Sequence, residues 1–226
     1  ATAAVHAVTY DGKTYGMPYS IENVGLVRNT ELVPEAKSSY DEVIAAGTTA
    51  GTEYKFLVGL SPEQGDPYHL YPLQTSFGGQ VFEQNADGSY DSSKLVIGDE
   101  SGTAFAQWLA TQGAAGAGVL NANIDGDRAR EFFIAGKSPY YLTGPWNIPA
   151  IKEAGIKYAI DPLPSAGGED ARPFIGVNAF FLSSKSTNAL AATNFIVNYL
   201  STDEAQLALY EVGGRPPALA SAYEAA

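Results

Sequence analysis

The chain has 226 residues, 45% of them hydrophobic, which is enough to build a core in one large domain or two small ones. Acidic residues outnumber basic ones 25 to 13, for a formal net charge of -12, so no nucleic-acid or anionic-membrane partner is expected. The absence of cysteine excludes a disulfide scaffold and a thiolate metal site, and two histidines make a histidine-built site improbable. We therefore expect no metal and no cofactor.

The first fifty residues predict strands followed by a helix. Residues 8–28 alternate apolar and polar side chains around Asp11-Gly12, a pattern that predicts a hairpin leading into a further strand. Ser38 or Ser39 can cap a helix over residues 40–46, with an acidic residue in its first turn.

The next segment predicts a buried strand over residues 54–60 and then a helix. Asp66 can cap this helix, Pro67 suits its first position, and Gly78-Gly79 would end it. Further helices are expected over residues 102–112, 127–135 and 189–200 and after Ser201 or Thr202, and strands over 140–142, 157–160 and 174–182. Strands that alternate with helices indicate an α/β fold with ligand sites at strand ends.

Three segments combine an aromatic ring with a polar group at a break in regular structure: residues 19–23, 66–71 and 144–147. A sugar ring offers an apolar face to an aromatic side chain and a rim of hydroxyls to carboxylates and amides. The composition of these segments therefore suits an oligosaccharide ligand.

Each candidate side chain also has an ordinary structural interpretation. Glu22 ends an alternating strand and either faces solvent or accepts a ligand hydroxyl. Asp66 can be a helix cap, a ligand acceptor or both. Trp146 follows Gly144-Pro145, a turn that either packs the ring or leaves it open to a ligand.

Motifs along almost the whole chain resemble those of the maltose- and maltodextrin-binding proteins, which are extracellular solute-binding proteins of ABC importers. Their order and spacing make the likeness more specific than any one motif. They are Tyr10-Asp11-Gly12-Lys13, residues 18–26, Asp66-Pro67-Tyr68, Tyr71-Pro72-Leu73, Gly78-Gly79, Gly136-Lys137, Gly144-Pro145-Trp146, and residues 172–177 and 199–204.

The resemblance implies a periplasmic-binding-protein-like fold whose two lobes close on an oligosaccharide and present it to a membrane permease. It implies a monomer in the periplasm or at the cell surface, although no signal peptide is visible in the chain. Glu22 and Asp66 would accept sugar hydroxyls, Tyr68 would stack on a sugar, and Trp146 would be the main stacking platform.

The family layout also implies a division of the chain. Residues 1–20 and 177–213 would belong to the first lobe, residues 21–176 to the second, and residues 214–226 would begin a return to the second. On this layout the chain is a fragment, mostly the second lobe with part of the first.

The sequence departs from the maltose type at three positions. That type has Glu where Asp66 stands, an aromatic where His69 stands and a tyrosine where Gly126 stands. The main alternative to a non-catalytic receptor is a glycoside hydrolase that uses Glu22 and Asp66 as a carboxylate pair. A third and weaker hypothesis is that the protein is a purely structural interaction module.

Overall fold

The structure is a computed structural model that describes residues 2–63, 65–86 and 89–226. The chain forms two compact units: unit 1 comprises residues 1–23, 144–149 and 175–226, and unit 2 comprises residues 24–143 and 150–174. The chain therefore passes from unit 1 to unit 2 after Asn23, returns for residues 144–149, and returns finally after Phe174.

Residues 214–226 fall in unit 1, because helix α9 (Ala220–Ala225) packs on helix α8 (Asp203–Gly213). The expected layout grouped these residues with the second lobe instead. How the segments divide between the lobes of a receptor stays a prediction.

Unit 2 is built on a sheet in the order β5-β8-β4-β9. Its strands are β4 (Gly25–Asn29), β5 (Leu57–Val58), β8 (Tyr140–Thr143) and β9 (Tyr158–Asp161). β4 pairs antiparallel with β8 and β9, whereas β5 runs parallel to β8. Every residue of β5 and β8 is buried. Because both faces of these strands are covered, their sequences show no alternation of apolar and polar residues.

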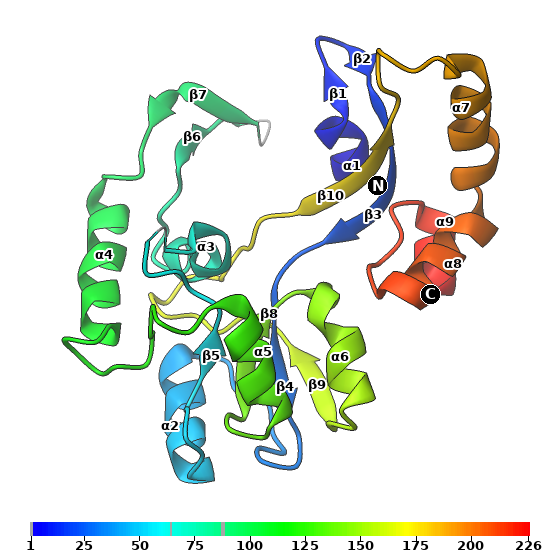
Figure 1. Ribbon diagram of the computed structural model, residues 1–226. Coiled ribbons are helices and arrows are strands. Elements are labelled where there is room, and N and C mark those ends of the chain that lie inside the picture. Colours follow the sequence, from blue (N-terminus) through cyan, green and yellow to red (C-terminus); the bar gives the residue numbers. More distant parts are fainter. Residues whose placement is uncertain (1, 64, 87–88) are drawn as a thin grey trace. The chain divides into compact units, whose positions relative to one another are not determined.

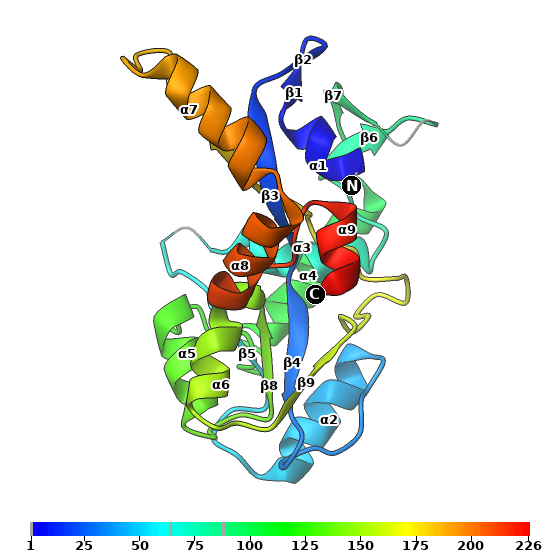
Figure 2. The ribbon, with the colours of Figure 1, turned by 90° about the vertical axis from the view of Figure 1, so that its right-hand side faces the viewer.

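Helices cover both faces of this sheet. Helices α5 (Gly126–Ile134) and α6 (Ile148–Glu153) lie on one side, and α2 (Tyr40–Ala50) lies on the other (Figures 1 and 2). The sequence pattern places both Phe132 and Phe133 of α5 inward; Phe133 is fully buried, but Phe132 lies nearer the surface and stacks on Tyr54. The α/β prediction is confirmed in this unit.

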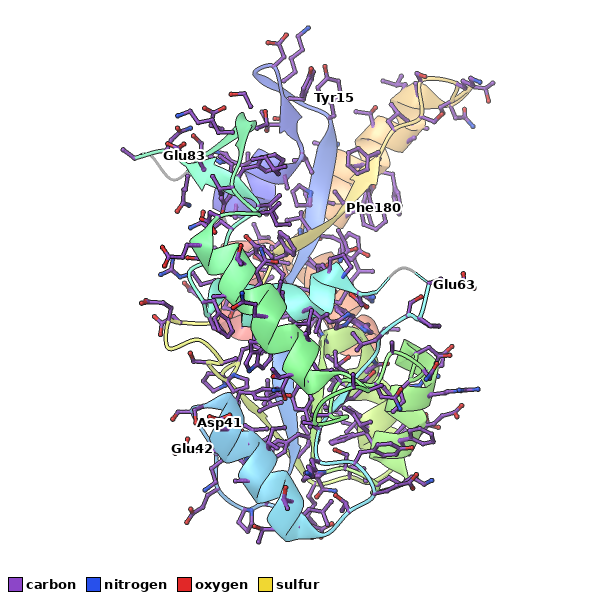
Figure 3. The ribbon with its side chains drawn as sticks, turned by 90° about the vertical axis from the view of Figure 1, so that its left-hand side faces the viewer. Tyr15, Asp41, Glu42, Glu63, Glu83 and Phe180 are labelled. Carbon is purple, nitrogen blue, oxygen red and sulfur yellow. The ribbon has the colours of Figure 1, made fainter. Side chains whose placement is uncertain are left out.

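The start of α2 shows why its sequence folds as a helix. The Ser39 hydroxyl accepts the backbone N–H of Glu42, while the Glu42 carboxylate accepts the backbone N–H of Ser39. Hydrogen bonds from the Ser39 and Ser38 backbone lower the pKa of Glu42. Asp41 and Glu42 project from this first turn (Figure 3), where the helix dipole favours negative charge.

A second cluster in unit 2 joins three helices. Tyr40 of α2, Leu73 of α3 (Pro67–Thr75) and Phe105 of α4 (Glu100–Gln112) are buried together. Trp108 packs on this cluster, edge-on to Tyr40 at 5.0 Å between centroids, as expected for a core tryptophan. Strands β6 (Phe82–Gln84) and β7 (Tyr90–Leu95) pair antiparallel; the sequence pattern of residues 85–89 between them predicts a turn, and residues 87–88 lie outside the described residues.

A buried ion pair joins two strands of the unit 2 sheet. Arg28 of β4 donates from Nε to Asp161 Oδ2 at 2.6 Å and from Nη2 to Oδ1 at 3.0 Å, and both side chains are 7% exposed. The remaining guanidinium nitrogen donates to the carbonyls of Val33 and Pro34. The hydrogen bond to Asp161 raises the pKa of Arg28. Every nitrogen of the guanidinium thus donates a hydrogen bond, which offsets the cost of burying the charge.

Unit 1 centres on two antiparallel strands, β3 (Gly16–Glu22) and β10 (Gly176–Phe181), whose register shifts between Asn178 and Ala179. Tyr19 and Phe180 pack their rings 4.7 Å apart on this sheet, and Phe180 can be followed in Figure 3. Before β3 come helix α1 (Thr2–Ala7) and the hairpin of β1 (Thr9–Tyr10) and β2 (Lys13–Thr14). The predicted Asp11-Gly12 turn is confirmed, with both residues at positive φ.

The helices of unit 1 follow β10. Helix α7 (Ala189–Phe195) continues into the π-helix η2 (Ile196–Leu200), and α8 then starts at Thr202, whose hydroxyl accepts the N–H of Ala205. Figure 2 shows α8 and α9 together beside β3. Across the described ranges, no helix is both long and apolar enough to cross a bilayer.

We predict that Asp161→Asn lowers the free energy of unfolding of unit 2 by about 3 to 5 kcal/mol, because it leaves the buried Arg28 charge uncompensated without changing volume. The control is Glu31→Gln, which breaks the neighbouring exposed pair of Glu31 and Lys157 and should cost less than about 1 kcal/mol. Urea denaturation measures both, and equal losses would contradict the assignment.

Candidate functional site

Glu22 is the last residue of β3 and is held on both edges of the strand. Gly176 of β10 pairs with it on one edge. From the other side, Arg215 Nε donates to its Oε2 at 2.7 Å, with 13% of the glutamate side chain and 34% of the arginine side chain exposed. Glu22 therefore does not simply face solvent; it forms a half-buried ion pair at the end of a strand.

The segment that carries Arg215 also touches the turn that carries Trp146. Gly214, at φ 69°, ends α8, and a Cβ placed there would lie 3.4 Å from Pro149 Cγ and 3.5 Å from the carbonyl oxygen of Pro145. The structure thus brings two of the predicted residues, Glu22 and Trp146, to one segment of unit 1, although they are far apart in sequence.

Trp146 lies in the single 3₁₀ turn η1 (Pro145–Asn147). Its ring folds back onto Gly144, so closely that a Cβ at residue 144 would lie 2.1 Å from Trp146 Cζ3. A Cβ at residue 144 would therefore force the ring to move, although the φ of −107° is open to any residue. The ring itself remains half-buried, which is compatible with a platform for a ligand.

Asp66 caps helix α3 in unit 2, as the sequence predicts. Its Oδ1 accepts the backbone N–H of His69 at 3.0 Å, and its Oδ2 lies 2.7 Å from His69 Nδ1. Pro67 occupies the first turn. A carboxylate oxygen can accept a second hydrogen bond, so the cap and a ligand contact are compatible.

Tyr68 belongs to a small group of rings in unit 2. Phe174 stacks on Tyr71 at 3.8 Å and 11° and is nearly parallel to Tyr68 at 6.0 Å and 15°. Tyr71 is buried, which raises the pKa of its hydroxyl, whereas Tyr68 is half-buried and Phe174 is 39% exposed. Tyr68 and Asp66 therefore lie on the same first turn, with Phe174 beside Tyr68.

Arg215 and Phe174 are the residues that the sequence interpretation did not single out. Phe174 stands within a family motif but carries no polar group that would mark it. Arg215 follows a glycine pair that reads only as a helix end. The sequence signal that could have identified Arg215 is its position between two residues that fix the backbone. Gly214 turns the chain, and Pro216 restricts Arg215 to extended backbone angles.

Two other features of the described residues do not bear on these side chains. A surface groove of about 610 Å³ lies between residues 32–37 and α2, and none of the four predicted residues lines it. Within the described ranges, no three His, Cys, Asp or Glu side chains are grouped so that they could hold a metal ion.

The fold and these residues agree with what comparison with known proteins shows. The model of the bacterial extracellular solute-binding protein family matches residues 1–226, and the chain belongs to that family. The structure is similar to that of the Thermus thermophilus maltotriose binding protein bound with maltotriose, at a TM-score of 0.87 and 30% identity, covering 100% of this chain and 59% of that one. The predicted periplasmic-binding-protein fold is confirmed.

Curated relatives include the galactooligosaccharide-binding protein of Bacillus subtilis, 29% identical over 97% of this chain and 52% of the relative. The maltodextrin-binding protein MdxE of the same organism is 29% identical over 93% of this chain and 51% of the relative. The chain thus spans about half the length of these relatives.

We predict that Gly144→Ala displaces the Trp146 ring and shifts its fluorescence emission to longer wavelength, because the new methyl group would occupy the place of the ring. The measurement uses a Trp108→Phe background, so that the emission comes from Trp146 alone. Gly213→Ala is the matched control, since a Cβ there meets no atom within 4 Å. Identical emission from both variants would contradict the described packing.

Proposed function

We propose that this protein binds a neutral oligosaccharide of the maltodextrin type outside the cytoplasm and delivers it to the permease of an ABC transporter. The observation that carries the proposal is in unit 1. The turn that carries the half-buried Trp146 ring lies next to Gly214, and the following residue, Arg215, pairs with the carboxylate of Glu22 at a strand end. A ring and an acid are the two groups that a sugar needs.

The names of the relatives support this class of ligand. They are a galactooligosaccharide-binding protein, a maltodextrin-binding protein and a maltotriose-binding protein of Pyrococcus abyssi. Two maltooligosaccharide ABC transporter solute-binding lipoproteins of Streptococcus pneumoniae, each 27% identical, support the transporter partner and the extracytoplasmic location.

Each predicted residue has a distinct part in the proposed binding. Trp146 covers the apolar face of one sugar unit, and Glu22 accepts a hydroxyl through its free oxygen. In unit 2, Asp66 accepts a second hydroxyl, and Tyr68, backed by Phe174, supplies another ring. The ligand gains affinity from apolar contact with the rings, and the carboxylates fix its orientation.

The link between Asp66 and His69 sets this site apart from a maltose-type one. A shorter acid and an imidazole stand where that type has glutamate and an aromatic ring, and here the two side chains engage each other. We infer that Asp66 and His69 offer hydrogen bonds to sugar hydroxyls and less ring surface. The ligand therefore belongs to the oligosaccharide class, with a selectivity of its own.

The hydrolase alternative has less support. A glycoside hydrolase needs one carboxyl group that holds a proton for the leaving oxygen. In this structure both candidate carboxylates accept hydrogen bonds from nitrogen donors, Glu22 from Arg215 and Asp66 from the helix N-terminus. The relatives are named as binding proteins, which favours the receptor over the hydrolase.

We predict that isothermal titration calorimetry with maltotriose and longer maltodextrins gives a dissociation constant of about 1 μM or lower, which corresponds to a binding free energy of about −8 kcal/mol. The same mixtures should release no reducing ends on incubation. If reducing ends are released at a rate proportional to protein concentration, and Glu22→Gln abolishes this release, the receptor proposal is wrong and the hydrolase alternative is right.

We also predict that Trp146→Ala weakens oligosaccharide binding about thirtyfold, or about 2 kcal/mol, as for a buried aromatic contact, with little change in melting temperature. The control is Tyr10→Ala, which removes a ring that is 77% exposed on the β1–β2 hairpin of the same unit. A large drop in melting temperature with unchanged affinity per folded molecule would show that Trp146 is a core residue.

A further inference from the structure

The ion pair of Glu22 and Arg215 uses only part of its hydrogen-bonding capacity. Arg215 Nε donates to Glu22 Oε2. Among the described residues, neither Glu22 Oε1 nor the two Nη groups of Arg215 has a hydrogen-bond partner. Glu22 thus has one oxygen fixed by a cation and a second oxygen available to accept.

The backbone around Arg215 is fixed on both sides. Gly214, in the left-handed conformation, ends α8 and turns the chain toward β3. After it, Pro216 accepts the N–H of Ile21 at 3.0 Å, and Pro217 forms an antiparallel bridge with Ser20. Pro216 also restricts Arg215 to extended backbone angles. The guanidinium group of Arg215 therefore reaches Glu22 from a backbone segment that has little conformational freedom.

A buried glutamine secures the same segment from α8. Gln206 is 3% exposed, accepts the N–H of Leu219 at 2.9 Å and donates to the carbonyl of Pro18 at 3.3 Å. The backbone N–H of Ala218 in turn donates to Tyr19 at 3.1 Å. Residues 216–218 thereby lie along the edge of β3 opposite β10, like a further strand.

We propose that Arg215 is a positioning residue for the ligand: it holds the Glu22 carboxylate in the one orientation that presents Oε1 to a sugar hydroxyl. This inference rests on the proposed function and adds to it the residue that orients the acid. Because Glu22 is 13% exposed, its charge needs a fixed partner to remain in place. The arginine supplies that charge through a rigid planar group, and so the carboxylate is already oriented before the ligand arrives.

The test is a double-mutant cycle on the protein, with the affinity for maltotriose measured by calorimetry for wild type, Arg215→Ala, Glu22→Gln and the double variant. If Arg215 acts through Glu22, Arg215→Ala weakens binding about tenfold in the wild-type background, the value of one hydrogen bond to a charged group. In the Glu22→Gln background the same change should cost less than about twofold.

Two controls separate positioning from a structural role. Lys185→Ala removes an exposed positive charge of the same unit and should leave the affinity unchanged. Arg215→Lys retains the charge without the planar fork and should recover only part of the lost affinity. Melting temperatures of all variants, measured without sugar, report loss of fold.

The possible results are distinct. Equal losses from Arg215→Ala in both backgrounds would overturn the inference, because Arg215 would then act independently of Glu22. A lowered melting temperature with unchanged affinity per folded molecule would overturn it in favour of a structural role. If the unsubstituted protein binds none of the maltodextrins, the proposed function fails and this inference fails with it, a result that differs from both of the others.

Discussion

The pairing of residues 216–218 with β3 is the constraint on which the candidate site in unit 1 depends. β10 occupies one edge of β3, and this short segment occupies the other through hydrogen bonds at Ile21 and Tyr19. Both edges of β3 are therefore paired at Ser20 and Ile21, directly before Glu22 at the end of the strand. At this strand end Glu22 meets Arg215, and the neighbouring Gly214 lies beside the turn of Trp146.

Local signals gave most of the fold, because each acts within a few residues. The Ser39 capping box, the Asp66 cap with its proline and the Asp11-Gly12 turn are where the sequence predicts them. The predicted lengths of the elements were less accurate. The strand expected over residues 54–60 pairs only at Leu57 and Val58. Strand length depends on which partner is alongside, in this case the short β8, and no local pattern encodes that.

The candidate site was predictable only in part, for the same reason. Residue type and a break in regular structure single out Glu22 and Trp146 as possible ligand contacts. Their common attachment to the segment of Arg215 follows from contacts across nearly the whole chain, between residues 22 and 215, which spacing cannot show. Likewise, the stacking of Phe174 on α3 comes from a loop about a hundred residues away.

The half-buried acid and ring of unit 1 are the proposed contacts with an oligosaccharide. A crystal structure of the protein grown with maltotriose tests these contacts most directly. It should show a sugar hydroxyl about 2.6 to 3.0 Å from Glu22 Oε1, with Arg215 still on Oε2 and the apolar face of a sugar unit on the Trp146 ring. A bound sugar that touches neither Glu22 nor Trp146 would contradict the account.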